Sequence, residues 1–255
     1  MIIDFSNYSA SQRYHLMTQT IIPRPIAWAL TASNLNSLPL NNNNEINLAP
    51  FSYFTAVSSE PAILMISVGK KPNGDAKDTL VNVLKNKKMV IHIASEQQAE
   101  LVTQTAATLP YGQSELTLLE TEYATPEIVN KSVDSIVNVS TNASSDLLNK
   151  PLTKVQSNPN QTRLNLTQFK GFELPRLQQC HVAYGCDLYE IKEMGDTPQT
   201  LIFLEVKQVF INEEVIQLDD KNRIKVNAAE VKPLARLGAN EYAGITKPYI
   251  NKRPQ

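Results

Sequence analysis

The sequence predicts a mainly β protein, built as an antiparallel β-barrel with a few helices. Segments rich in β-branched and apolar residues recur along the chain, and turn-forming residues separate them. Helical patterns are few, and they do not alternate with strands in the βαβ rhythm of a parallel sheet. Residues 62–68 form a nearly unbroken apolar run between Pro61 and Gly69, which is typical of a strand buried on both faces.

Length and composition restrict the class of protein. A chain of 255 residues with 42% hydrophobic residues can bury a sizeable core, and we expect one domain over residues 1–255. The net charge of −1 argues against a nucleic-acid partner, which normally needs a basic excess. No apolar run has the length of a membrane span and the N-terminus does not resemble a signal peptide, so we expect no membrane partner and a cytoplasmic location.

The first elements are a short helix or irregular lead over residues 1–20 and a barrel strand over residues 21–33. Two prolines at the start of this strand indicate an edge or a bulge. Arg24 lies between them on a stiff backbone, where its fork of donors can hold a phosphate; the alternative is a surface ion pair with a carboxylate. The Asn-rich residues 34–46 predict a hairpin loop to the next strand.

Residues 47–58 are predicted to form the second strand and its approach. Three aromatic residues gather here, and a strand that packs a core explains them as well as a bound ligand does. In the apolar run that follows, Ser67 is the exception. Its hydroxyl needs a partner if it is buried, and that partner is either a neighbouring carbonyl or a ligand at the strand end.

A basic loop, GKKPNGDAK at residues 69–77, precedes a helix predicted over residues 78–87. We expect Asp78 to be the N-cap of this helix. Lys77 and Thr79 would then lie beside free amides at the positive end of the helix dipole, which suits an anion. A solvated loop before an ordinary capped helix explains the same pattern, because no phosphate-loop or dinucleotide motif is present.

The middle of the chain continues with a buried strand over residues 89–94. His92 lies within it, and we expect a histidine in an apolar strand to be a satisfied core residue. A second helix is predicted over residues 96–105 and an irregular segment over 106–122. Residues 130–167 are rich in Asn, Ser and Thr, and they predict an insertion that is partly ordered at best.

Three strands complete the chain, over residues 180–192, 200–211 and 224–226, with a turn signal before the last. Cys180 and Cys186 have an even separation, so we expect two reduced, packed thiols on one face of a strand. Their spacing does not fit a zinc site, and no other set of metal ligands is present. With three histidines and no Ser/His/Asp arrangement, we assign no catalytic side chain.

Several motifs together resemble the flavin reductase-like, FMN-binding split-barrel family of flavoredoxin-like flavoproteins. They are PRPIAW (23–28), NLAPFSYF (47–54), SVG (67–69), KDT (77–79), LPR (174–176) and RLGANEY (236–242). The likeness covers residues 15–125 and 171–245. Gln199 and Thr200 occupy a region where many relatives carry a histidine. Ala239 replaces a family glycine and would be strained if this position needs a positive φ.

The resemblance implies a Greek-key split barrel, a homodimer, and FMN in grooves at the subunit interface. Arg24, Lys77 and Thr79 are implied to hold the phosphate, and the backbone around Phe51 to Tyr53 to bind the pyrimidine edge. The full set implied for cofactor binding is Arg24, Trp28, Asn47, Ala49, Phe51, Ser52, Tyr53, Ser67, Val68, Gly69, Lys77, Asp78 and Thr79.

The activity that the resemblance implies is NAD(P)H-dependent flavin reduction. Hydride from NADH or NADPH would pass through FMN to a second acceptor, with the cofactor carrying the chemistry. The alternative is a non-enzymatic electron carrier or redox sensor that binds FMN and exchanges electrons with a protein partner. A third reading is a barrel that has lost its cofactor and keeps a dimer role. The sequence does not separate the first two, nor does it identify the acceptor or the preferred nicotinamide.

Overall fold

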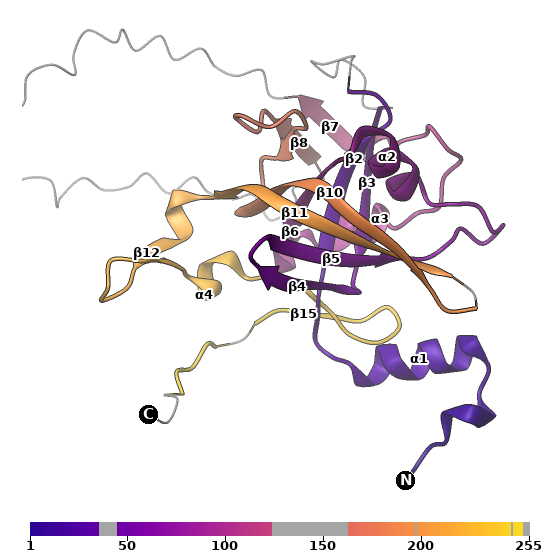
Figure 1. Ribbon diagram of the computed structural model, residues 1–255. Helices are drawn as coiled ribbons and strands as arrows, with labels where there is room; N and C mark the ends of the chain where they lie inside the picture. The colour runs from indigo at the N-terminus through magenta and orange to yellow at the C-terminus, as the bar shows by residue number, and fades with distance from the viewer. Residues whose placement is uncertain (36–44, 124–162, 197, 246, 252–255) are drawn as a thin grey trace, which may run out of the picture.

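The computed structural model describes residues 1–35, 45–123, 163–196, 198–245 and 247–251. Its main feature is a seven-stranded antiparallel sheet in the order β3-β2-β6-β10-β11-β5-β4 (Figure 1). The seven strands are β2 (Ala27–Ala32), β3 (Ile46–Phe51), β4 (Phe54–Ser59), β5 (Ala62–Val68), β6 (Lys88–Ile93), β10 (Val182–Met194) and β11 (Gln199–Ile211). This confirms the mainly β, antiparallel fold that the sequence predicts.

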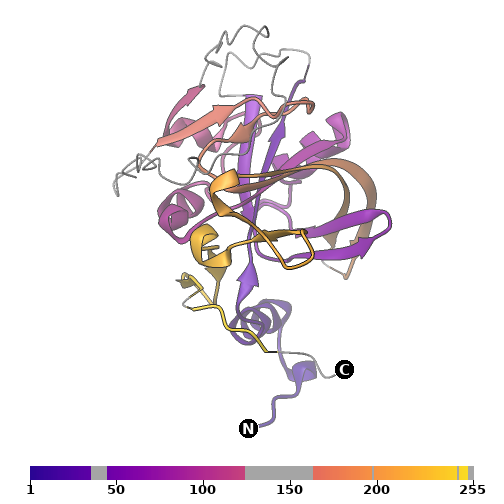
Figure 2. The ribbon, with the colours of Figure 1, turned by 90° about the vertical axis from the view of Figure 1, so that its left-hand side faces the viewer.

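The two edge strands of the sheet, β3 and β4, follow each other directly in the sequence. Only Ser52 and Tyr53 separate them, so the sheet curls round until its two edges approach each other at this turn (Figure 2). The Ser67 amide donates to the Tyr53 carbonyl at 2.9 Å and fastens the turn to the end of β5. The result is a split barrel: the two edge strands do not pair with each other, and the turn at Ser52 and Tyr53 joins them.

Smaller sheets flank the barrel. Short strands far apart in the sequence form one of them, β1 (Arg24–Pro25), β14 (Ala235–Arg236) and β15 (Tyr242–Ala243). The other two contain β7 (Glu120–Tyr123), β8 (Arg163–Thr167) and β9 (Arg176–Leu177), and β12 (Ile216–Leu218) with β13 (Ile224–Val226). The first sheet brings the N-terminal and C-terminal parts of the chain together.

The helices are short and lie at the ends and on one flank of the barrel. They are α1 (Ala10–Thr20), α2 (Asp78–Asn86), α3 (Ala99–Gln104) and α4 (Ala228–Val231). The helix α2 packs on β2 and β3, while α1 stands apart from the sheet near the N-terminus (Figure 1). No helix in the described part of the chain is long and apolar enough to cross a membrane.

Two hydrophobic clusters form the core, and alternating residues of β2 divide between them. Trp28 and Leu30 belong to one cluster, and Ala27 and Ala29 to the other, because successive strand residues point to opposite faces. All of these residues are buried. The strand β2 is therefore covered on both faces. Its neighbour β3, which pairs with it along its whole length, contains residues of the candidate site described below.

Two predicted elements are confirmed in their position, and the predicted second strand is wrong. The strand β5 has the predicted bounds, and α2 ends one residue before the predicted helix end. Residues 47–58 do not form one strand. The chain turns at Ser52 and Tyr53 into β4, whose residues are largely exposed, so the apolar pattern continues across a reversal of direction.

Both cysteines are buried thiols, as predicted, but they do not share a strand face. Cys180 precedes β10 and packs in the cluster of Trp28, whereas Cys186 lies within β10 and packs in the other cluster. A register shift between Gly185 and Cys186 further breaks the alternation on which the prediction rested.

The predicted Asn-rich loop and insertion lie mostly outside the described residues, which omit 36–44 and 124–162. At the end of the predicted insertion, residues 163–167 form β8, which pairs in parallel with β7. This is compatible with the prediction of a segment that is ordered only in part.

Candidate functional site

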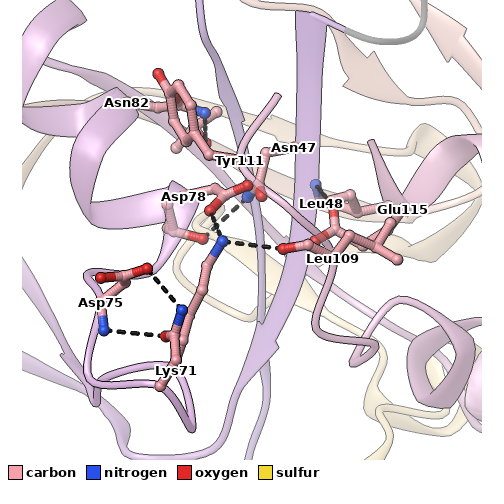
Figure 3. Close-up of polar contacts among 12 residues, drawn as sticks. Asn47, Leu48, Lys71, Asp75, Asp78, Asn82, Leu109, Tyr111 and Glu115 are labelled. Atoms are coloured by element: carbon pink, nitrogen blue, oxygen red, sulfur yellow. Dashed lines mark hydrogen bonds and ion pairs between the residues drawn. The ribbon is translucent and has the colours of Figure 1, made fainter. Parts of the chain in front are cut away.

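A pocket lies beside the N-terminal end of α2, between β3, the loop before α2, and the segment that leads to the short 3-10 helix Glu115–Leu118 (Figure 3). One part of its lining is charged, with two lysines and two carboxyl groups. Most of the other lining residues have small side chains, such as alanine and threonine. The lining residues are Asn47, Ala49, Pro50, Lys71, Lys77, Asp78, Thr79, Thr105, Ala106, Ala107, Thr108, Leu109 and Glu115.

Local chain geometry directs these side chains toward one another. Asn47 and Ala49 are two residues apart on β3 and therefore face the same side. In the loop after β5, Gly74 adopts a positive φ of 91°, and the Lys71 amide donates to the Asp75 carbonyl at 2.8 Å. This turn brings the chain back, so that Lys71 and Lys77 both reach the pocket.

Lys77 is the N-cap residue of α2, with φ −70° and ψ 147°. Its ammonium lies 5.6 Å from the centre of the Phe51 ring, and no carboxylate forms a salt bridge with it among the described residues. Burial lowers the pKa of the Lys77 ammonium from its ordinary value, while the Glu115 charge opposes this shift. A half-buried cation with no anionic partner favours an anionic ligand.

Asp78 is the first residue of α2, and the prediction that it caps the helix is wrong. Its carboxylate instead forms an ion pair with Lys71, whose ammonium also donates to the Leu109 carbonyl at 3.0 Å (Figure 3). The positive charge of Lys71 is thus largely balanced, and the pair ties the basic loop to the far wall of the pocket.

Asn47 and Thr79 meet at the base of the pocket. The Asn47 side-chain amide donates to the Thr79 hydroxyl at 2.9 Å, and both residues are buried. The first intrahelical hydrogen bonds run from the Leu80 and Val81 amides to the Lys77 carbonyl. The amides of Asp78 and Thr79 come before these bonds, so they have no acceptor within the helix. A hydroxyl, an ammonium and the start of a helix therefore lie together, as the sequence predicts.

Glu115 is a pocket residue that the sequence analysis missed. The side chain is 5% exposed, and one carboxyl oxygen accepts a hydrogen bond from the Leu48 amide at 3.2 Å. Burial raises the pKa of the Glu115 carboxyl to about 7, and the nearby Asp78 charge acts in the same direction. The sequence places Glu115 only within the irregular segment predicted over residues 106–122, and no local pattern there indicates that its side chain reaches the pocket.

Arg24 is placed differently from the predicted phosphate ligand. It is 5% exposed, and its guanidinium donates to the carbonyls of Thr18, Ile21 and Leu237 at 2.6–2.7 Å. A longer bond reaches the Ser52 hydroxyl at 3.4 Å. Four of its five donors are thus engaged within the chain, and Arg24 does not line the pocket of Lys77. Neither of the two predicted roles, phosphate ligand or partner of a surface carboxylate, matches this geometry.

Trp28 is completely buried, which leaves no side-chain surface for a ligand. Its indole N–H donates to the Thr105 hydroxyl at 2.8 Å, and Thr105 lines the pocket. The residue therefore supports the pocket wall from behind. This contact is a tertiary one, because Trp28 lies on β2 and Thr105 lies at the C-terminal end of α3.

The remaining predicted residues fall into two groups. Asn47, Ala49, Lys77, Asp78 and Thr79 line the pocket, and Phe51 lies under the Lys77 ammonium. The other group, Ser52, Tyr53, Ser67, Val68 and Gly69, lies around the turn between β3 and β4 and the end of β5, outside the pocket lining. The Tyr53 hydroxyl is buried with no hydrogen-bond partner in the described structure.

Comparison with known proteins gives a family match and full-length relatives. Residues 19–131 match the model of a family described as flavin reductase like domain. The chain is 27% identical to YwrF, an uncharacterized protein of Bacillus subtilis, over 99% of this chain and 98% of that protein. It is also 27% identical to an uncharacterized protein of Aquifex aeolicus, over 90% of this chain and 88% of that protein.

Solved structures share the fold over nearly the whole chain. Nitrilotriacetate monooxygenase component B from Bacillus cereus has a TM-score of 0.69 at 22% identity, covering 98% of both chains. The 2-nitrobenzoate 2-nitroreductase NbaA from Pseudomonas fluorescens has the same TM-score and identity, covering 100% of this chain and 96% of that one. An FMN-binding protein from Thermus thermophilus has a TM-score of 0.56 at 15% identity, covering 92% and 93%.

Proposed function

We propose that this protein is an FMN-binding flavoprotein oxidoreductase, because residues 19–131 match the flavin reductase like domain and the main sheet forms a split barrel. Its proposed reaction is the NADH- or NADPH-dependent reduction of flavin. When bound, FMN would supply the hydride and electron transfer to a second acceptor, and the protein would supply binding and orientation.

The observation that carries the proposal is the unpaired ammonium of Lys77 at the start of α2. A phosphate group needs positive charge, hydrogen-bond donors and a helix N-terminus, and the pocket offers all three. The Thr79 hydroxyl accepts from Asn47 and keeps its own proton to donate. The donor set of the pocket therefore fits the phosphate of FMN.

We assign the roles of this chain's residues accordingly. Lys77, Thr79 and the first amides of α2 would hold the phosphate, and Asn47 would orient the Thr79 hydroxyl. The Lys71–Asp78 ion pair would fix the loop that carries Lys77. For the ring of the cofactor we retain the turn from Phe51 to Tyr53 and the end of β5 as the proposed contact region. The Ser67 amide joins the two through the Tyr53 carbonyl, and the Tyr53 hydroxyl has no hydrogen-bond partner in the described structure.

We also propose that the protein is a homodimer. The edge strand β4 exposes nearly all of its residues, and Val57 at its centre is 53% exposed. An exposed edge with an apolar side chain is a favourable surface for a second subunit.

The first experiment is an absorbance spectrum of the purified protein, followed by anaerobic addition of NADH and of NADPH. The reductase proposal predicts yellow protein that bleaches rapidly with one donor. Yellow protein that neither donor bleaches would favour an electron carrier or redox sensor served by a protein partner. A protein that stays colourless after incubation with FMN would contradict the whole proposal.

The phosphate assignment predicts the effect of removing its two side chains. The double variant Lys77→Ala, Thr79→Ala should bind FMN at least tenfold more weakly, which corresponds to about 1.4 kcal/mol or more. Fluorescence titration with FMN measures this directly. Lys70→Ala is the matched control, because Lys70 is an exposed lysine of the same loop that does not line the pocket. Equal affinity of the double variant and the control would contradict the assignment.

A further inference from the structure

The pocket contains a carboxyl group in a position where its charge would oppose the proposed ligand. Glu115 lies in the same lining as Lys77 and Thr79, and it enters from the opposite side, through the short 3-10 helix Glu115–Leu118. A group that is 5% exposed is nearly out of contact with water, and an ionised carboxylate there needs a cation to balance it.

The cations around Glu115 balance its charge only weakly. Against the effect of burial, Lys71 lowers the pKa of Glu115, but its effect is the smallest on that carboxyl, because Lys71 is committed to Asp78 and to the Leu109 carbonyl. Lys77 forms no salt bridge with Glu115 and lies over the Phe51 ring. The helix α2 presents Asp78, a second negative charge, and β3 presents only the Leu48 amide.

The last wall of the pocket contributes no ionisable side chain. It is formed by residues 105–109, which are threonine, alanine and leucine. The polar support of the carboxyl comes from backbone amides, its own and that of Leu48, and burial outweighs their effect on its pKa. The neutral acid is therefore the form that this environment favours.

We propose that Glu115 is the specificity-determining residue of this pocket: it admits a phosphorylated flavin as a neutral carboxylic acid, and its ionisation excludes the phosphate. The inference rests on the proposed function, because it takes the phosphate of FMN as the ligand of Lys77 and Thr79. The position of the pKa of Glu115 near 7, raised first by burial, makes this change accessible under ordinary conditions.

The sign of the effect follows from linkage between proton and ligand. A phosphate dianion and an ionised Glu115 repel each other, so FMN binding raises the proton affinity of Glu115 and takes up a proton. By reciprocity, FMN affinity falls as pH rises through the ionisation of Glu115, by at most tenfold for each pH unit. The phosphate of FMN ionises near pH 6, and this works in the opposite direction below about pH 7.

Riboflavin serves as the uncharged probe, because it lacks the phosphate. The experiment measures the dissociation constants of FMN and riboflavin by fluorescence titration between about pH 6.5 and 8.5, for wild type, Glu115→Gln and Glu230→Gln. Glutamine keeps the shape of the side chain and can accept from the Leu48 amide. Glu230 is an exposed residue of α4 that does not line the pocket, so its variant is the matched control.

We expect the preference of the wild type for FMN over riboflavin to fall about tenfold over this range. The Glu230→Gln control should show the same decline, and Glu115→Gln should keep a high and nearly constant preference. If Glu115→Gln retains the decline of the wild type, Glu115 is not the responsible group and the inference is overturned.

A second measurement uses the wild-type protein alone, so it does not depend on the folding of any variant. Calorimetric titration with FMN at about pH 8, in two buffers of different ionisation enthalpy, counts the protons that binding takes up. The expected result is an uptake approaching one proton, and an uptake of zero overturns the inference. Failure of the proposed function has a different signature, since the protein would then bind neither FMN nor riboflavin at any pH.

Discussion

His92 lies on β6, fully buried in the sheet, where its ring joins two other strands. The Leu177 amide donates to Nε2 at 2.9 Å, so Nδ1 carries the proton and donates to the Trp28 carbonyl at 3.0 Å. Both ring nitrogens are satisfied in the neutral form, which confirms the prediction of a core histidine. Burial lowers the pKa of His92 to about 4.

This histidine makes folding stability depend on pH in the acid range. The unfolded chain binds a proton at His92 near pH 6.5, while the folded chain resists protonation until about pH 4. Stability should therefore fall as pH drops from 6.5 toward 4, by on the order of 3 kcal/mol from this residue. Glu115 has the opposite effect on stability, because the folded chain holds its proton more tightly than the unfolded chain does. Its contribution to stability is therefore lost as pH rises toward 7.

Urea unfolding at pH 7 and at pH 4.5 tests the role of His92. His92→Gln should be less stable than wild type at pH 7, because one hydrogen bond is lost, and should lose less stability on acidification. Carboxylates contribute equally to both proteins, so they cancel in the comparison. The same loss of stability in both proteins would assign the acid sensitivity to other groups.

Sequence reasoning at the residue scale succeeded where the functional groups are local. Lys77 and Thr79 are adjacent to a helix start, and local geometry alone places them together with its first amides. Lys71 and Glu115 could not be found in this way, because a turn and a separate 3-10 helix carry them to the pocket. The same limit applies to Trp28, whose full burial depends on strands far away in the sequence.

At the scale of elements, Arg24 holds three segments of the chain together. It binds carbonyls at the end of α1 and just beyond it, and the Leu237 carbonyl after β14. The strand β1, which contains Arg24, also pairs with β14. One guanidinium thus connects the N-terminal helix to the C-terminal part of the barrel, and this is the role that the structure supports for the PRP motif.

Replacing this guanidinium by an ammonium should weaken the connection without removing the charge. Arg24→Lys cannot reach three carbonyls with a rigid fork, and we expect a loss of stability of about 1.5–3 kcal/mol, the value of one hydrogen bond to a charged group. Urea unfolding without added flavin measures the loss. Arg223→Lys is the matched control, because that exposed arginine pairs with Asp219 in a surface turn and should change stability far less than Arg24→Lys does. Equal stability of the two variants would contradict the structural role.

The turn between β3 and β4 shows why one predicted element failed. The aromatic residues of 47–58 lie on both sides of the reversal at Ser52 and Tyr53, no glycine marks it, and the nearby Pro50 lies inside β3. The pairing of β4 with β5 decides it, and this pairing is a tertiary contact. By contrast, the concern about Ala239 is confirmed, because its φ of 45° is the left-handed region that alanine adopts at a cost.

At the scale of the whole molecule, the two edges of the sheet differ: the β3 edge is largely buried, and the β4 edge is open. The strand β4 pairs only with β5 in the described sheet, and five of its six residues are exposed. The sequence could predict the barrel because its strands are strongly patterned. It could not predict which edge stays open, because that depends on the order in which seven strands pair.

The open edge leads to the last prediction, on the proposed homodimer. Val57 lies at a register shift in β4 and is 53% exposed, so an aspartate at this position should leave the fold intact and disfavour an apolar interface. Light scattering should give twice the mass of one chain for wild type and the mass of one chain for Val57→Asp at micromolar concentration. Ile224→Asp is the control, because Ile224 is 66% exposed on the separate β12–β13 hairpin.

The same variant tests whether cofactor binding needs the second subunit. If FMN lies in a groove between subunits, Val57→Asp should lose FMN affinity together with its dimeric mass, while far-UV circular dichroism stays unchanged. If the variant is monomeric and binds FMN like the wild type, one chain completes the site alone, and the Lys77 pocket must be sufficient. If wild type is itself monomeric, the exposed β4 edge needs another explanation and the proposed interface is wrong.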